Sequence, residues 1–472
     1  MSDKNRENHV SEQTITRPAH SSGGQAGTDR LRPRIHPRPR RGWLNDPNGL
    51  LHYEGRYHVF CQYNPDSARH HRINWAHLSS PDLVRWTEHP VAIAPDRDGP
   101  DAFGCWSGVA TLDDGVPTLV YTGVQQEGGA SSVVLARSGD ADLDTWSKLD
   151  DRGAVRTATG MPEGEGVTDV RDPFLFTHHG HRYALQGAGS PDGDPAVLLY
   201  DAEDLDDWRF LGRLLDAQNV RAVDLAPAEI WECPQLVQVD GRWVMLLSQW
   251  RWVDGKHLLS GVSYLVGELV DDSGALPFRF EVASGGVADT GPDFYAPQVL
   301  AGGEHGAGAG PLLWGWSWEG RDEVLADEAG WAGVLTLPRR LRLEGERLVV
   351  EPAAELEALR ASCTRLGGGV LHELGDLTEV VVEPSGTDVE VVLVTIEGED
   401  CGRVETVLRL SAAAGLRVFI DHSVVEAFCG DAVAHTVRAY PAAEQRWAVR
   451  AGEGTVVEAW ELDAMDVNYR SE

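Results

Sequence analysis

Acidic residues recur along the chain at a nearly constant interval. Starting at Asp46 in WLNDPNGLL, steps of 60, 66, 60 and 61 residues reach Trp106 in CWSG, Asp172 in RDPF, Glu232 in WECPQ and Asp293 in DFYAPQ. Carboxylates that share a pocket separate one another's pKa values, so that one can hold a proton while another is ionised. If these side chains converge, the pattern indicates chemistry carried out by paired carboxylic acids.

The segment DPNG after Asn45 also predicts a turn, since Pro47 fixes its own φ and Asn48 and Gly49 tolerate left-handed backbone conformations. A turn would need Asp46 only as a cap. Such a cap has no reason to recur in phase with other acids, so a functional role for Asp46 is favoured.

The acids need elements that repeat with the same interval. The phrases DLVRW, DLDTW and DLDDW occur at 82–86, 142–146 and 204–208, and hairpins with a glycine turn and an aromatic residue are predicted at 53–63, 178–188 and 239–249. Self-similarity of this period, carried by short strands, is typical of a β-propeller in which each blade is one sheet. Residues 31–340 would hold five blades, with equivalent positions at one end of the central channel.

The remainder of the chain differs from the repeat. Residues 1–30 are rich in Ser, Gly and charge and predict a disordered arm. A linker with a short helix is predicted at 341–360, and alternating strands over 361–472 indicate a β-sandwich. The predicted fold class is all-β, a five-bladed β-propeller followed by a C-terminal β-sandwich.

The chain has 472 residues, a formal charge of −33 and a pI near 4.8, which argues against nucleic acid and anionic membrane surfaces as partners. A neutral substrate fits better. No apolar segment resembles a signal peptide or a spanning helix, so we expect a cytoplasmic protein. The six cysteines form no CxxC pair, and the histidines of RHH (69–71) and HHGH (178–181) fit solvated turns, so we expect neither a required metal nor a cofactor.

These motifs resemble those of glycoside hydrolase family 32, the retaining β-fructosidases that include invertase, levanase, exo-inulinase and sucrose-6-phosphate hydrolase. HPRPRRGWLNDPNG (36–49) is similar to the family's opening motif, RDP (171–173) to its second and EC (232–233) to its third, in the family order. The similarity runs from about His36 to the C-terminus. It implies a five-bladed propeller joined to a β-sandwich.

The resemblance implies a role for each acid: Asp46 as nucleophile, Asp172 as a stabiliser of fructose hydroxyls and of the transition state, and Glu232 as general acid and base. Cleavage of a ketosidic bond builds positive charge at the anomeric carbon, so an ionised carboxylate attacks while a protonated one donates to the leaving oxygen. Water then releases fructose with retained configuration.

Further positions are similar to sugar-binding elements of the family: Asn45, Gln62, Trp75, Trp106, Ser107, Arg171, Asp293, Tyr295 and Trp316. Packing in a blade core is an equal alternative for Trp75 and is favoured for two of the three tryptophans of WGWSW (314–318). Cys61, Ala76 and Val109 depart from the family pattern, so the resemblance does not predict the outer wall of the pocket.

The leading hypothesis is a β-fructofuranosidase that acts on sucrose or short fructo-oligosaccharides. A sucrose-6-phosphate hydrolase would require a basic pocket, for which the arginines available are Arg38, Arg40 and Arg41, or Arg69 and Arg72. An exo-acting levanase or inulinase and a fructosyltransferase remain alternatives. A silent fructan-binding protein is disfavoured because all three acids are present.

Overall fold

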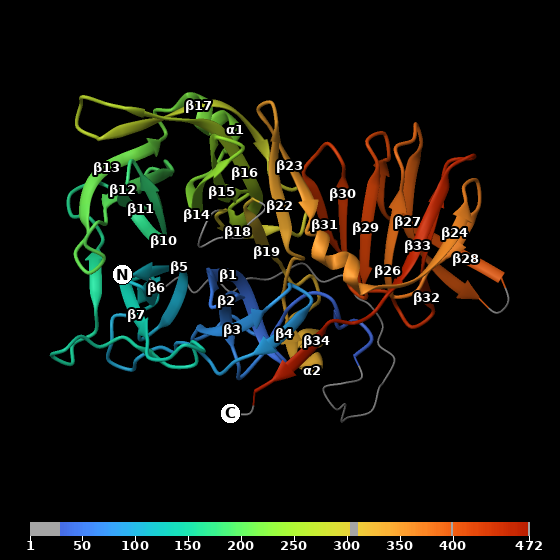
Figure 1. Ribbon diagram of the computed structural model, residues 1–472, viewed down its shortest axis with the longest axis horizontal. Coiled ribbons are helices and arrows are strands. Elements are labelled where there is room, and N and C mark those ends of the chain that lie inside the picture. Colours follow the sequence, from blue (N-terminus) through green and yellow to red (C-terminus); the bar gives the residue numbers. More distant parts are fainter. Residues whose placement is uncertain (1–28, 303–309, 398–399, 471–472) are drawn as a thin grey trace.

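The computed structural model describes residues 29–302, 310–397 and 400–470. The predicted N-terminal arm lies outside these residues except for its last two. Strands dominate the described chain, which confirms the all-β prediction, and none of its helices is long and apolar enough to cross a membrane. Figure 1 shows the sheets of the first three-quarters of the chain grouped on one side and the later strands standing beside them.

The first sheet contains the two ends of the described chain. Its order is β20-β1-β2-β3-β4-β34, with β1 in parallel contact with the late strand β20 and β34 parallel to the edge strand β4. The strands are β1 (Gly42–Tyr53), β2 (Arg56–Asn64), β3 (Asn74–Ser80), β4 (Arg85–Glu88), β20 (Trp331–Ala332) and β34 (Asp466–Tyr469).

Three more sheets complete the first part of the chain. The second holds β5 (Gly104–Asp113), β6 (Val116–Val124), β7 (Ser131–Ser138), β8 (Trp146–Ser147) and β9 (Thr157–Gly160). The third holds β10 (Thr168–His178), β11 (His181–Gly189), β12 (Ala196–Asp201), β13 (Arg209–Asp216), β14 (Ile230–Val239), β15 (Arg242–Val253), β16 (Lys256–Asp271) and β17 (Phe278–Val287). The fourth holds β18 (Tyr295–Leu300), β19 (Leu312–Ser317), β21 (Val334–Leu335), β22 (Arg339–Glu344) and β23 (Arg347–Pro352).

The third sheet has two halves. β10–β13 and β14–β17 each form a run of antiparallel neighbours, and among the described residues the strand pairing between the halves is limited to Gly189 and Ile230. The strands that begin each run also contact one another across the sheets, in the cyclic order β1, β5, β10, β14, β18 and back to β1. Residues at equivalent positions along these five strands therefore lie near one another around the centre of the ring.

The helices are short and connect strands. α1 (Val220–Leu225) is capped by the side chain of Asn219, and α2 (Glu323–Ala329) by that of Asp322. The predicted linker helix forms as a 3₁₀ helix, η1 (Ala354–Leu359), whose Leu356 and Leu359 are buried.

Two further sheets follow η1 and pack face to face. One has the order β24-β33-β26-β29-β30-β31 and the other β25-β32-β27-β28. Val380 and Val418 of the first sheet and Val391 and Val449 of the second share one apolar cluster, as expected of a β-sandwich. Their bounds are β24 (Arg360–Gly367), β25 (Leu371–Glu373), β26 (Leu377–Val382), β27 (Asp388–Glu397), β28 (Asp400–Ser411), β29 (Leu416–Asp421), β30 (Val424–Cys429), β31 (Ala434–Arg438), β32 (Gln445–Ala451) and β33 (Val456–Leu462).

A buried ionic network joins the two parts. The imidazole of His36 lies between Asp421 at 2.7 Å and Glu426 at 2.9 Å, and all three side chains are fully buried. Arg339 pairs with Glu426 at 2.6 Å and with Asp289 at 2.8 Å. Burial alone would lower the pKa of His36, but the two carboxylates outweigh it and raise that pKa to about 9, so His36 is a cation at neutral pH.

Candidate active site

The five strands of the ring are bulged where they pass its centre. Bulges bend a strand and re-aim its side chains. The register shifts fall at Leu44/Pro47, Cys105/Gly108, Arg171/Phe174, Glu232/Gln235 and Tyr295/Gln298, which are the in-phase motifs of the sequence. The predicted turn at DPNG is therefore wrong, because these residues form a bulge inside the continuous strand β1.

Left-handed backbone conformations occur at these bulges. Gly49 has φ of +56°, and a Cβ built there would lie 2.8 Å from the ring of Phe60. Asp172 and Cys233 have φ of +59° and +47°. A non-glycine residue in this region carries strain that the surrounding structure must support.

Asp46 lies on β1 and accepts hydrogen bonds on both carboxylate oxygens. Asn45 donates to Oδ1 at 3.1 Å, while Gln62 and Ser107 donate to Oδ2 at 3.0 and 2.6 Å. Burial raises the pKa of Asp46, and the bonds from Ser107 and Asn45 oppose that rise. These donors fix the carboxylate and favour its ionised form.

Asp172 lies on β10 and is held by main-chain contacts. Its own N–H donates to Oγ1 of Thr122 at 2.8 Å, and the N–H of Cys233 donates to its Oδ2 at 3.0 Å. Burial raises the pKa of Asp172 to about 7, with the charges of Glu232 and Asp46 adding to the rise and Arg171 opposing it. A pocket of three such acids retains a proton near neutral pH.

Glu232 lies on β14 and is clamped from both sides. Arg171 donates to Oε1 at 2.9 Å through Nε, and the hydroxyl of Tyr295 on β18 donates to Oε2 at 2.5 Å. Arg171 also stacks over the indole of Trp250, with 5.3 Å between the guanidinium carbon and the ring centre. The three acids thus come from three of the five strands of the ring, of which β10 and β14 are neighbours and β1 is separated from β10 by β5.

A pocket of about 330 Å³ opens above the acids. Of the residues predicted from the sequence, its lining includes Asn45, Asp46, Gln62, Trp106, Arg171, Asp172, Glu232, Tyr295 and Trp316. Ser107 lies directly beneath, bonded to Asp46 and Gln62. Most of the site residues predicted from the sequence therefore meet at this pocket.

Two predicted site residues lie elsewhere. Trp75 is fully buried in an apolar cluster with Phe60 and Tyr121, and its Nε1 donates to the carbonyl of Trp106, so its prediction as a pocket wall is wrong. Asp293 accepts hydrogen bonds from the Trp318 indole at 2.7 Å and from the Arg438 N–H at 2.7 Å, which directs it to the sandwich.

The three departures from the family pattern also lie outside this pocket. Cys61 and Ala76 face each other across β2 and β3 and are buried, as is Val109 on β5. They change packing in the first two sheets instead of the outer wall of the pocket. Trp314 is also buried in the core, which leaves Trp316 as the pocket wall within WGWSW.

Four pocket residues were missed. Trp43 precedes the LNDPNG segment, and its indole donates to Asn45 at 2.8 Å. Trp250 and Leu259 are cross-strand partners on β15 and β16 that reach the pocket. His70 belongs to RHH and was interpreted as a solvated turn residue; it lines the pocket, and burial lowers its pKa.

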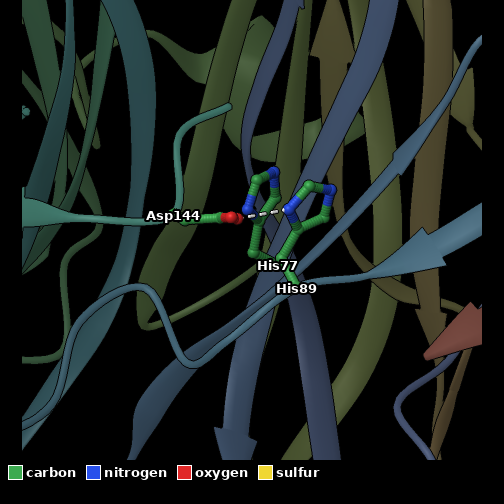
Figure 2. A group of neighbouring side chains, drawn as sticks. All are labelled: His77, His89 and Asp144. Atoms are coloured by element: carbon green, nitrogen blue, oxygen red, sulfur yellow. Dashed lines mark hydrogen bonds and ion pairs between the residues drawn. The ribbon is translucent and has the colours of Figure 1, made fainter. Parts of the chain in front are cut away.

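Two groups of histidines and acids among the described residues have side-chain atoms close enough together to hold a metal ion. Figure 2 shows His77 and His89 stacked beside Asp144, with ring centres 4.0 Å apart and planes 22° apart. Both nitrogens of His89 are already bonded, to Asp144 at 2.6 Å and to Ser79 at 2.7 Å.

The second group, His178 and His179 with Asp271, is largely open to solvent, at distances of 3.9 and 3.5 Å from the carboxylate. The Figure 2 cluster is therefore a hydrogen-bonded stack within the first two sheets, and neither group adjoins the acids.

Comparison with known sequences assigns the chain to a family. The profile of the Glycosyl hydrolases family 32 N-terminal domain matches residues 36–352, and that of the Glycosyl hydrolases family 32 C terminal matches residues 376–463. The chain belongs to glycosyl hydrolase family 32. The resemblance inferred from the three motifs is thereby confirmed, and the chain is a glycosidase of the β-fructofuranosidase type.

Relatives within family 32 include an invertase and a sucrose-6-phosphate hydrolase. The chain is 33% identical over 399 residues to a raffinose invertase of Escherichia coli, covering 83% of this chain and 77% of the relative. It is 31% identical over 382 residues to a sucrose-6-phosphate hydrolase of Bacillus subtilis, covering 77% and 75%.

Solved structures of family 32 share the fold. A β-fructofuranosidase of Bombyx mori, determined in complex with sucrose, superposes with a TM-score of 0.75 at 27% identity, covering 94% of this chain and 96% of that chain. A sucrose-6-phosphate hydrolase of Lactobacillus gasseri has a TM-score of 0.76 at 24% identity, covering 93% and 95%.

Proposed function

We propose that this member of family 32 is a retaining β-fructofuranosidase that releases terminal fructose from sucrose or short fructo-oligosaccharides. The observation that carries the proposal is the convergence of Asp46, Asp172 and Glu232, from β1, β10 and β14, at one 330 Å³ pocket. A silent binding protein has no need of three acids arranged against their mutual repulsion.

Asp46 is the proposed nucleophile. Its three hydrogen-bond donors, Asn45, Gln62 and Ser107, orient the carboxylate for attack on the anomeric carbon and stabilise its ionised form. Asp172, with its rigid main-chain support, is the proposed partner of fructose hydroxyls and of the positive charge that develops at the anomeric carbon.

Glu232 is the proposed general acid and base. It must donate a proton to the leaving oxygen and then take one from water, so its carboxyl group must pass between two protonation states. Arg171 donates to one oxygen of that carboxyl group and Tyr295 to the other. Arg171 and Tyr295 therefore position Glu232 for proton transfer.

The pocket favours an unphosphorylated sugar. Among the described residues that line it, the basic side chains are Arg171 and His70. Arg171 is paired with Glu232 and Asp169, and burial disfavours the charged form of His70. A phosphate ester would therefore meet aromatic walls and three acids.

The arginines considered for phosphate binding lie elsewhere. Arg38 is buried over Trp331, Arg40 and Arg41 line a different cavity, and Arg69 pairs with Asp327. Several relatives are sucrose-6-phosphate hydrolases, and this activity is the second candidate function.

We also propose that the first part of the chain is a propeller of five blades. Five strands in a closed cycle and a third sheet with two halves support five blades. The predicted bounds of 31–340 for the blades and 341–360 for the linker are corrected, because β22 and β23 extend the fourth sheet to Pro352, which leaves η1 as the linker to the sandwich predicted over 361–472. The cytoplasmic location stays a prediction, which fractionation of the source cells would test.

Product analysis tests the function. The purified protein is incubated separately with sucrose, sucrose-6-phosphate, inulin and levan, and free fructose is measured. We expect fructose from sucrose. Release from the phosphate ester alone would transfer the assignment to the second candidate, and release from none of the four would leave only a binding protein.

A further inference from the structure

We propose that a second cavity, at the edge of the first sheet, binds a small phosphate ester. The cavity has a volume of about 530 Å³. None of the described residues that line it also lines the acid pocket. The inference goes beyond the release of fructose, because it gives the protein a second ligand of a different chemical class.

Three arginines from near the two ends of the described chain meet at this cavity. Arg40 and Arg41 directly precede β1, and Arg470 directly follows β34. β34 lies beside the edge strand β4 (Figure 1), and the N–H of Arg470 donates to the carbonyl of Glu88, the last residue of β4, at 3.1 Å. The fold thus gathers positive charge from residues that are far apart in the sequence.

Positive charge dominates the cavity. Among its described lining residues, Glu88 supplies the one carboxylate, and its Oε2 already accepts a hydrogen bond from the main-chain N–H of Arg40 at 3.0 Å. Arg41 is exposed, and within the described chain it forms no ion pair, so its guanidinium group can bind an anion. The formal charge of −33 does not cancel this local charge, because salt screens charges that lie more than about 10 Å away at 0.1 M ionic strength.

A buried arginine near the cavity lacks a hydrogen-bonded counter-charge. Arg38 is 5% exposed, and its three side-chain nitrogens have no hydrogen-bond partner among the described residues. Burial raises the pKa of Glu88 and that of Tyr63, which both line the cavity, and the charge of Arg38 opposes both rises. A buried cation without a partner is unfavourable. An anion in the cavity supplies the negative charge that Arg38 lacks.

The remaining walls fit the carbon skeleton of a phosphate ester. A guanidinium group presents a planar set of donors that binds phosphate oxygens in pairs. Aromatic and apolar surface comes from Tyr63, Pro65, Pro90 and Val91. Concave sites with apolar walls and a few charged groups are typical for small ligands. The combination favours a phosphorylated small molecule over a free phosphate ion.

Calorimetric titration of the full-length protein with glucose 6-phosphate tests the inference, with glucose as the match that lacks the phosphate. We expect saturable binding of glucose 6-phosphate and binding of glucose that is weaker by about tenfold or more. Arg41→Ala should raise the Kd for glucose 6-phosphate about tenfold through loss of charge-assisted hydrogen bonds, and Arg41→Glu should raise it further. The matched controls, Arg403→Ala and Arg403→Glu, change an exposed arginine on β28 of the sandwich and should leave the Kd within about twofold.

Three results would overturn the inference: no saturable binding of glucose 6-phosphate, the same Kd for glucose and for its phosphate, or a Kd that both Arg41 variants leave unchanged. The last result would place the ester at another site, such as the acid pocket. An equal rise of the Kd in the Arg403 variants would also overturn it, because the effect would then follow the net charge and not this cavity. Binding is measured without turnover, so these results do not depend on the proposed fructosidase function.

Discussion

The backbone N–H of Cys233 donates a 3.0 Å hydrogen bond to the carboxylate of Asp172. Cys233 directly follows Glu232, so the peptide that carries the proposed proton donor is tied to the proposed stabiliser on the neighbouring strand. A main-chain donor has no rotamer freedom, and the relative placement of the two acids is therefore fixed by the backbone. Burial raises the pKa of Asp172 to about 7, and the hydrogen bond from Cys233 opposes that rise.

Asp172→Asn should make the protein more stable and inactive. The folded-state pKa of Asp172 is raised from 3.8 to about 7, so the stability associated with its bound proton is fully present below pH 3.8 and lost as pH rises through 7. The variant avoids that loss and should unfold with a free energy larger by roughly 2–4 kcal/mol at pH 8.

Urea unfolding at several pH values measures this difference, which should vanish toward pH 4. Asp98→Asn, at an exposed position, is the control and should change stability little at either pH. A variant at Asp172 that is less stable than wild type at pH 8 would show that the carboxylate is not the strained group.

Glu232→Ala and Asp46→Ala should differ in their dependence on the leaving group. Loss of a general acid costs about 10²–10⁴-fold on sucrose and much less on an aryl fructoside, whose leaving group needs no proton. Loss of the nucleophile should abolish turnover of both substrates. Steady-state kinetics with sucrose and an aryl β-fructofuranoside give the ratio, and equal losses for Glu232→Ala on both would remove Glu232 from the acid role.

His36→Gln should destabilise the junction between the two parts of the chain in a pH-dependent way. The folded-state pKa of His36 is raised from 6.5 to about 9, so its stabilisation is fully present below pH 6.5 and is lost as pH rises through 9. We expect a loss of about 3 kcal/mol at pH 6, because Asp421 and Glu426 stay buried without their shared cation.

Thermal unfolding at pH 6 and pH 10 measures the effect, with the exposed His71→Gln as control. A destabilisation of equal size at both pH values would mean that His36 acts through packing and not through its charge.

Gly49→Ala should reduce activity by displacing Asp46. The new Cβ would lie 2.8 Å from Phe60 and 3.1 Å from Trp75, in addition to the strain of φ +56°. Gly345→Ala has a similar φ of +64° but meets nothing within 4 Å, so it isolates the strain of the backbone from the clash. We expect kcat to fall about tenfold or more for Gly49→Ala alone; similar kinetics for the two variants would contradict the proposed role of this contact.

The acids could be predicted from the sequence because their spacing repeats the spacing of the sheets. Asp46, Asp172 and Glu232 were found by phase and motif, and the ring of strands brings them together. The bulge at DPNG could not be predicted, because Pro-Asn-Gly carries the same local preferences in a turn and in a bulge, and the choice depends on pairing with β2.

The aromatic walls were harder to predict than the acids. Trp75 follows Asn74 in β3 and Trp106 follows Cys105 in β5, yet Trp75 is buried in the core and Trp106 lines the pocket. A bulge between Cys105 and Gly108 re-aims Trp106, and no such shift occurs in the pairing of β2 with β3, which carries Trp75. Trp250 was missed because it reaches the pocket only through the pairing of β15 with β16.

The pairing of β34 with β4 has a consequence for biosynthesis. β4 begins at Arg85, but its partner β34 (Asp466–Tyr469) follows far later in the chain and is synthesised after every other strand described. Until then β4 presents an unpaired edge, which is a site where chains can associate wrongly. The strands of the sandwich are synthesised entirely within that interval, so of the sheets described, the one that begins first is completed after the others.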